Sequence, residues 1–151
     1  MNKNKIDLFI AAPLTSFEPG EYVINNKKIC ELTFWVRENS LYKNIFYAGE
    51  NKNEKINFDT PKKAIKIDLD AIQCCRYFIL IYPVETITSA FVEIGYAMAL
   101  KKKIHIFVKK RKDLPFILQN SDYVYENIYM HEYLNDLMLE EKFKSFILSM
   151  K

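Results

Sequence analysis

The sequence predicts an α/β fold, with one doubly wound, mainly parallel sheet of five strands and helices on both of its faces. Short apolar segments alternate along the chain with longer segments of helical periodicity, and this order is typical of strand–helix–strand units with right-handed crossovers. The run Tyr77–Tyr82 is hydrophobic throughout, as expected for a central strand that is buried on both faces. The length of 151 residues suits one ordinary domain with a substantial core.

Two strands are expected in the N-terminal third, with a long helix between them. Ile6–Ala12 is a short apolar run and predicts the first strand. The apolar residues of Tyr22–Asn39 recur at helical spacing, and Asn44–Ala48 predicts a short second strand. The stretch Gly49–Thr60 is polar, rich in Asn and Lys and without periodicity, so we expect a mobile loop there.

A helix, the central strand and another helix are expected next. Pro61 suits the first position of a helix, with Thr60 as its N-cap, and the helical pattern ends near Cys75. The central strand described above is ended by Pro83. The apolar run Thr88–Leu100 then predicts a further helix.

The C-terminal third continues the alternation. A strand is expected at Lys103–Val108, followed by a short helical segment at Leu114–Leu118. Tyr123–Tyr129 predicts the fifth strand, and Leu134–Met150 predicts a closing helix. The sequence has no internal repeat and no sign of a second domain, so residues 1–151 are expected to form one domain.

Composition places the chain among soluble intracellular proteins. No apolar stretch approaches the length of about 20 residues that a membrane-spanning helix needs. The basic N-terminus lacks a small-residue cleavage site, so we expect no signal peptide and a mature chain that begins at Met1. The three cysteines, Cys30, Cys74 and Cys75, are odd in number and give no disulfide framework. We therefore expect a cytoplasmic protein.

No metal, cofactor or nucleic acid is expected as a partner. His105 and His131 lack the spacing of a metal-ligand set and are expected to be structural. The loop after the first strand contains one glycine, Gly20, which excludes both a dinucleotide fingerprint and a P-loop. The positive charge is concentrated in Lys101–Lys103 and Lys109–Lys112, at opposite ends of one strand, without interleaved aromatic residues for base stacking.

Glu93 is the most informative residue, because it is a single acid inside an otherwise apolar helical run. Helical spacing puts it on the same face as Tyr96, Ala97 and Leu100, a face that is expected to pack inward. An unpaired carboxylate there costs several kcal/mol or takes up a proton. A capping box would need Ser or Thr three residues earlier, where the chain has Ala90. Glu93 is therefore a candidate functional acid, with a solvated or salt-bridged acid as the alternative.

The expected fold places Glu93 beside a crevice. In doubly wound sheets, ligands bind outside the carboxyl ends of the strands, where the strand order reverses. This brings the loop after the first strand next to the start of the Glu93 helix. In that loop, Thr15 could bind a ribose or phosphate and Phe17 could stack on a base, with turn formation and core packing as the alternatives. Ser89, at the helix start, could hold a phosphate or a sugar hydroxyl, or act as a plain N-cap.

Three segments carry a resemblance to a known family: Ile6–Pro13, Asp68–Cys74 and Ser89–Leu100. In order and at similar spacing, they resemble the nucleoside 2-deoxyribosyltransferase superfamily. The resemblance is most specific at Glu-Ile-Gly-Tyr-Ala, residues 93–97. Residues Asp113–Leu118 resemble a branch of the superfamily that shares features with Toll/interleukin-receptor-like glycohydrolases. The resemblance implies a small-molecule substrate whose N-glycosidic bond is broken: a nucleoside, a nucleotide or nicotinamide adenine dinucleotide (NAD).

The resemblance also implies roles for individual residues. Glu93 aligns with the family's catalytic glutamate, which attacks or stabilises the anomeric carbon as the base leaves. Asp68 aligns with an acid that contacts or protonates the base, with an exposed pair of helix acids, Asp68 and Asp70, as the alternative. Arg76 stands where the family usually has a second acid, and Thr86–Ser89 replaces the usual lead-in to the glutamate. We therefore expect an N-glycosidase, with base exchange by a deoxyribosyltransferase or nucleotide binding without turnover as the alternatives. Relatives of this kind often share residues between neighbouring subunits, so a homodimer or larger homo-oligomer is expected.

Overall fold

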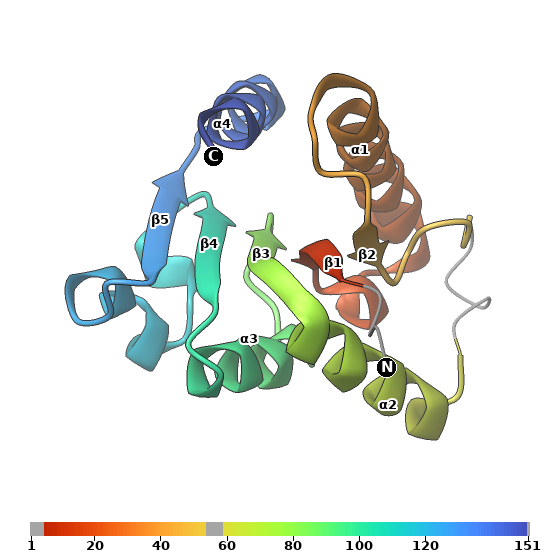
Figure 1. Cartoon of the computed structure of the whole chain (residues 1–151), viewed down its shortest axis with the longest axis horizontal. Helices are drawn as coiled ribbons and strands as arrows, with labels where there is room; N and C mark the ends of the chain where they lie inside the picture. The colour runs from red at the N-terminus through yellow and green to blue at the C-terminus, as the bar shows by residue number, and fades with distance from the viewer. Residues whose placement is uncertain (1–4, 54–58, 151) are drawn as a thin grey trace.

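The computed structural model describes residues 5–53 and 59–150. It contains one five-stranded sheet in the order β2-β1-β3-β4-β5, and every neighbouring pair of strands is parallel (Figure 1). The strands are β1 (Ile6–Ala11), β2 (Ile45–Tyr47), β3 (Cys75–Tyr82), β4 (Lys103–Val108) and β5 (Ile128–Glu132). The helices are α1 (Pro19–Asn39), α2 (Pro61–Cys74), α3 (Ala90–Ala99) and α4 (Asp136–Ser149).

The predicted fold class is confirmed. Figure 1 shows α1 and α4 on one face of the sheet and α2 and α3 on the other. The order of the strands reverses between β1 and β3, so the crevice expected for a ligand lies outside the carboxyl ends of these two strands.

Two apolar layers hold the helices to the sheet. Strand β3 contributes to both, because its side chains alternate between the faces and its middle residues are fully buried. Tyr22 and Phe143 pack in the layer beneath α1 and α4. Ile72 and Ile94 pack in the layer beneath α2 and α3. The second layer places both helices that carry the predicted acids against the same face of the sheet.

The first helix begins three residues earlier than predicted, at Pro19 instead of Tyr22. Pro19 suits this position because a helix's first turn does not use its N–H groups. The backbone N–H of Glu18 donates a hydrogen bond to the carboxylate of Glu21 over 3.2 Å, which fixes the helix start. Gly20 therefore belongs to the first helical turn and not to the loop.

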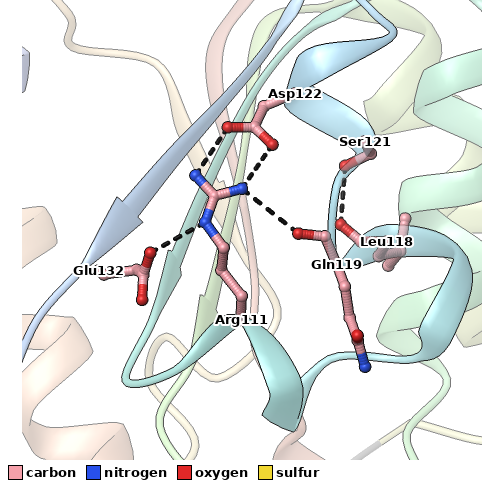
Figure 2. A network of polar contacts seen from close by, with 6 residues as sticks. All are labelled: Arg111, Leu118, Gln119, Ser121, Asp122 and Glu132. Carbon is pink, nitrogen blue, oxygen red and sulfur yellow. Dashed lines mark hydrogen bonds and ion pairs between the residues drawn. The ribbon is translucent and has the colours of Figure 1, made fainter.

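The prediction for the fifth strand was wrong in position. Strand β5 begins at Ile128, and Ser121–Tyr123 forms a 3₁₀ turn instead. Figure 2 shows the reason: Arg111 donates to both carboxylate oxygens of Asp122, over 2.6 and 2.8 Å, and to Glu132 over 2.9 Å. These hydrogen bonds from the Arg111 guanidinium group hold Asp122 beside the start of the connection between β4 and β5. In this position, the backbone around Asp122 forms a turn and does not extend as a strand.

The other boundaries differ little from the prediction. A short helical turn lies at Phe116–Leu118, within the predicted segment. Helix α4 begins after Asn135, whose side chain accepts a hydrogen bond from the N–H of Met138 over 3.0 Å. Thr60 occupies the N-cap position of α2, as predicted, but its side chain makes no capping hydrogen bond. Residues 54–58 of the predicted mobile loop lie outside the described residues.

Candidate functional site

A cavity of about 410 Å³ lies at the carboxyl ends of β1 and β2, between the loops that follow them and the helices α2 and α3. It brings together Thr15, Asp68, Ser89 and Glu93, which are four of the five predicted site residues. Its remaining wall comes from β2 and the turn after it, including Phe46, Glu50 and Lys52. The volume falls within the range of about 300–1,000 Å³ that is usual for small-molecule sites.

Glu93 lies in the first turn of α3, and its side chain is half-buried and lines the cavity. Within the described part of the chain, its side chain makes no hydrogen bond and no ion pair. Burial raises the pKa of its carboxyl group to about 8, and the nearby charge of Asp68 adds to the effect. The ionised form of Glu93 is therefore unfavourable in this environment, and no salt bridge among the described residues compensates for it.

Asp68 faces the same cavity from α2 and is also half-buried. Burial raises the pKa of this carboxyl group to about 6, opposed by the ammonium group of Lys52 and reinforced by Asp59. Because the charge of Asp68 affects Glu93, the two carboxyl groups titrate as a pair, with one pKa near 6 and the other near 8. Near pH 7 this pair holds one proton, so one acid and one carboxylate are present together.

The turn after β2 is anchored to α1 through the backbone of Lys52. The hydroxyl of Tyr22 donates to the carbonyl oxygen of Lys52 over 2.6 Å, and the side-chain amide of Asn26 donates to the same oxygen over 3.1 Å. The ammonium group of Lys52 pairs with Asp59 at 3.3 Å, just before α2. These contacts fix a cation on the side of the cavity next to Asp68.

Gly49 and Arg37 fix the rest of this turn. A Cβ atom at Gly49 would lie 2.2 Å from the side-chain oxygen of Asn26 and 2.8 Å from the ring of Tyr47, so only glycine fits there. The guanidinium group of Arg37 binds both oxygens of Glu50, one of them at 2.9 Å. The pair neutralises Glu50, so this carboxylate adds little net charge to the cavity.

The loop between β3 and α3 is held by hydroxyl groups. The hydroxyl of Tyr82 donates to the carbonyl oxygen of Thr86 and accepts from its N–H, each over 2.7 Å. The hydroxyl of Thr88 accepts the N–H of Ala90 over 3.2 Å. Ser89 occupies the N-cap position, but its side chain makes no capping hydrogen bond. Because Thr88 satisfies the helix start, the hydroxyl of Ser89 is left for the cavity that it lines.

Phe17 does not line the cavity. Its side chain is 1 % exposed and packs in the core layer beneath α1 and α4. The alternative of core packing, which the sequence left open, describes this residue, whereas Thr15 two positions earlier is exposed beside the cavity. Two aromatic residues of the short strand β2 line the cavity: Phe46, which is half-buried, and Tyr47, which is buried with its hydroxyl donating to Asn26.

Sequence reasoning missed Phe46 and Lys52. A signal for Phe46 was present, because an aromatic residue on a strand beside the reversal of strand order lies close to the expected crevice. Lys52 carried no such signal, since its position depends on hydrogen bonds to α1, 26 and 30 residues away in the sequence.

The two histidines lie elsewhere, against α4. Nδ1 of His105 and Nε2 of His131 are 2.9 Å apart, and Phe146 packs against the ring of His105. Burial lowers the pKa of His105 to about 3 and that of His131 to about 4, so both are neutral near pH 7. Over residues 5–53 and 59–150, no group of three or more His, Cys, Asp or Glu side chains is arranged to hold a metal ion.

The fold is similar to that of two solved structures. The CMP N-glycosidase BcmB of Clostridium botulinum is 22% identical, with a TM-score of 0.68 over 93% of this chain and 98% of BcmB. The chain shares the fold of an N-glycosidase. The solution structure of BlsM is 17% identical, with a TM-score of 0.71 over 95% of this chain and 90% of BlsM. No protein-family model matches the chain, and no curated protein matches it by sequence.

BcmB and BlsM confirm, at the level of the fold, the resemblance seen in the sequence. Their matches extend over nearly the whole chain, whereas the segments that carry the sequence resemblance end near residue 110. In the part of the chain that the structure describes, no helix is long and apolar enough to cross a membrane.

Proposed function

We propose that the protein is a nucleotide or nucleoside N-glycosidase in which Glu93 acts at the anomeric carbon of the sugar. One observation carries the proposal: the side chain of Glu93 reaches the cavity at the carboxyl ends of β1 and β2 without a hydrogen-bond or ion-pair partner among the described residues. Asp68 supports it, because it supplies a second carboxyl group in the same cavity. The fold shared with the CMP N-glycosidase BcmB supports the same class of reaction.

The chemistry needs one acid and one carboxylate, which the pair holds near pH 7. In the free protein the proton of the pair lies on Glu93, the weaker acid, and in this mechanism it passes to Asp68 when the substrate binds. As the bond between C1′ and the base nitrogen breaks, its electron pair leaves with the base, and the protonated Asp68 gives its proton to the base. The carboxylate of Glu93 stabilises the positive charge that develops at C1′, or bonds to C1′ covalently. Water then adds to C1′, and its proton returns to the pair, which restores the starting state.

Groups for the sugar and any phosphate line the same cavity. The hydroxyls of Thr15 and Ser89 are positioned for hydrogen bonds, and Ser89 lies at the positive end of the α3 dipole. The ammonium group of Lys52 also lines the cavity, where it is paired with Asp59, so it offers a hydrogen-bond donor more than a net positive charge. These groups suit a polar substrate such as a nucleoside or a nucleoside monophosphate.

The direct test is release of free base. Purified protein is incubated with nucleosides, nucleoside monophosphates and NAD, and free base is measured by chromatography. We expect release from at least one compound, with a loss of about 1,000-fold or more in Glu93→Gln. The exposed acid Glu126, which does not line the cavity, provides the matched control Glu126→Gln, which is expected to keep full activity.

Two results would overturn the proposal. Exchange of base between two nucleosides, without net hydrolysis, would identify a deoxyribosyltransferase. A ligand that raises the melting temperature with no product from any compound would identify a binding module, and the assignment of Glu93 as a catalytic residue would then be wrong.

A further inference from the structure

Three phenylalanine rings stand side by side across three neighbouring strands. The ring of Phe78 on β3 lies 5.3 Å from that of Phe9 on β1, with 10° between their planes. The ring of Phe9 lies 5.0 Å from that of Phe46 on β2, with 17° between their planes. Phe9 is the register partner of both other residues, so the three side chains point to the same face of the sheet.

The row of rings runs from the core to the cavity. Phe78 and Phe9 are 0 % and 2 % exposed, whereas Phe46 is half-buried and lines the cavity. Strand β2 is the edge strand of the sheet, so no further strand continues the row beyond Phe46. Phe9 covers one side of the Phe46 ring, and the other side has no stacking partner among the described residues.

Apolar groups of α2 lie around the same part of the cavity. Ala64, one helical turn before Asp68, and Ile67, the residue directly before it, both line the cavity. Together with Phe46 they provide an apolar surface directly beside a carboxyl group that can exchange a proton. A flat ring with polar atoms on its edge matches this arrangement, because its faces need apolar contact and its edge needs a hydrogen-bond partner.

We propose that Phe46 is the residue on which the heterocyclic base of the substrate stacks, as the fourth ring of the row. The proposal rests on the proposed function for the identity of the ligand, because a base is the flat part of a nucleoside or nucleotide. Stacking on Phe46 places the edge of the base toward Asp68 and leaves the sugar toward Glu93. It also assigns to Phe46 the role that the sequence suggested for Phe17.

The test uses three variants and a ligand that is not hydrolysed. Cytosine and adenine are titrated into the wild-type protein, and their dissociation constants are measured by NMR. Phe46→Leu keeps an apolar side chain but removes the ring, and is expected to weaken binding about tenfold. Phe46→Tyr keeps the ring and is expected to bind within about threefold of the wild type.

Phe78→Leu is the matched control. It removes a ring from the buried end of the same row, which does not line the cavity. We expect a loss of stability without a change in dissociation constant beyond about twofold. Equal binding by the wild type and Phe46→Leu would overturn the proposal, and so would equal weakening by Phe46→Leu and Phe78→Leu. Failure of the wild type to bind either base would also overturn it.

Parallel assays of base release separate this proposal from the proposed function. If bases bind through Phe46 but no compound is hydrolysed, the stacking role stands and the glycosidase activity fails. If base is released and Phe46→Leu leaves both KM and base binding unchanged, the activity stands and the stacking role fails. If both hold, Phe46→Leu raises KM about tenfold while kcat stays within about threefold.

Discussion

Asp68 and Glu93 reach one cavity from two different helices, and each carboxyl group has a pKa above its ordinary value. Glu93 is the weaker acid of the two, because burial affects it more strongly and Asp68 adds negative charge nearby. Lys52 lowers the pKa of Asp68 but is not among the groups that shift that of Glu93. The environment thus separates two chemically similar groups, which is the arrangement that acid–base catalysis requires.

A bell-shaped pH dependence follows for base release. Below about pH 6 both carboxyl groups are protonated and no carboxylate remains, whereas above about pH 8 both are ionised and no acid remains. We expect kcat/KM to be highest near pH 7 and to fall on both sides, measured from pH 4.5 to 9.5. A profile that is flat from pH 5 to 9 would contradict a role for the pair.

Asp68→Asn is expected to reduce kcat by about 100-fold to 10,000-fold, the range for loss of a general acid or base. It also removes the negative charge that raises the pKa of Glu93. The limb of the pH profile that remains is therefore expected to move to lower pH. Asp70→Asn is the matched control, because Asp70 lies on the same helix, is exposed and does not line the cavity.

Glu93→Gln is expected to make the protein more stable at alkaline pH. The folded-state pKa of about 8 lies above the unfolded value, so the folded state binds more protons between these two pKa values. Stability from Glu93 is therefore fully present below the unfolded pKa and is lost as the pH rises through about 8. Glutamine stays neutral, and we expect a gain on the order of 2 kcal/mol at pH 8.5 but little change at pH 4.5.

Urea unfolding of both proteins at the two pH values measures this difference. A variant that is less stable than the wild type at both pH values would show that the glutamate has a stabilising partner, and the account of Glu93 as an unpaired acid would fail.

Gly49→Ala is expected to destabilise the protein by about 1–3 kcal/mol, because its Cβ would overlap the side chains of Asn26 and Tyr47. Displacing this turn also moves Lys52, so KM for substrate is expected to rise. Gly20→Ala provides the control: a Cβ there meets no atom within 4 Å, and the residue lies in the first turn of α1. Thermal unfolding should show Gly20→Ala unchanged or slightly stabilised. Similar losses in both variants would contradict the steric explanation.

Arg111→Lys is expected to destabilise the segment that joins β4 to β5. Lysine keeps the charge but cannot bind both oxygens of Asp122 and also Glu132, as the guanidinium group does in Figure 2. We expect faster amide hydrogen exchange in Ser121–Tyr123, with little change in β1 and β3. Lys112→Arg, at an exposed neighbouring position, controls for a general effect of basic residues. Unchanged exchange in the variant would mean that the hydrogen bonds of Arg111 do not fix this turn.

The sequence was sufficient for the central elements because their signals are local. Strand β3 is a continuous hydrophobic run, and α3 carries one acid in an apolar pattern, so both the fold class and the position of Glu93 followed from short segments. Strand β5 was misplaced because the hydrophobic residues Tyr123, Val124 and Tyr125 resemble a strand but are exposed in the structure. Their conformation is decided by Arg111, which is more than ten residues away.

The cavity wall opposite Glu93 could not be predicted for a similar reason. Thr15 and Phe17 follow the same strand, and only the packing of the whole layer decides that Thr15 is exposed and Phe17 buried. Lys52 is placed by a carbonyl oxygen that Tyr22 and Asn26 hold. Such contacts join distant segments, and single-residue patterns do not encode them.

Helix α2 passes into β3 without a connecting loop, since the helix ends at Cys74 and the strand begins at Cys75. Lys102 fastens this junction by donating to the carbonyl oxygens of Gln73 and Cys75, over 2.9 and 2.8 Å. Asp68 therefore shares the rigidity of the central strand and has no hinge of its own. Substitutions that adapt this fold to a larger or smaller base are then expected at Phe46 and in the turn after β2, whether they arise by natural divergence or by protein engineering. Asp68 and Glu93 are expected to stay in place.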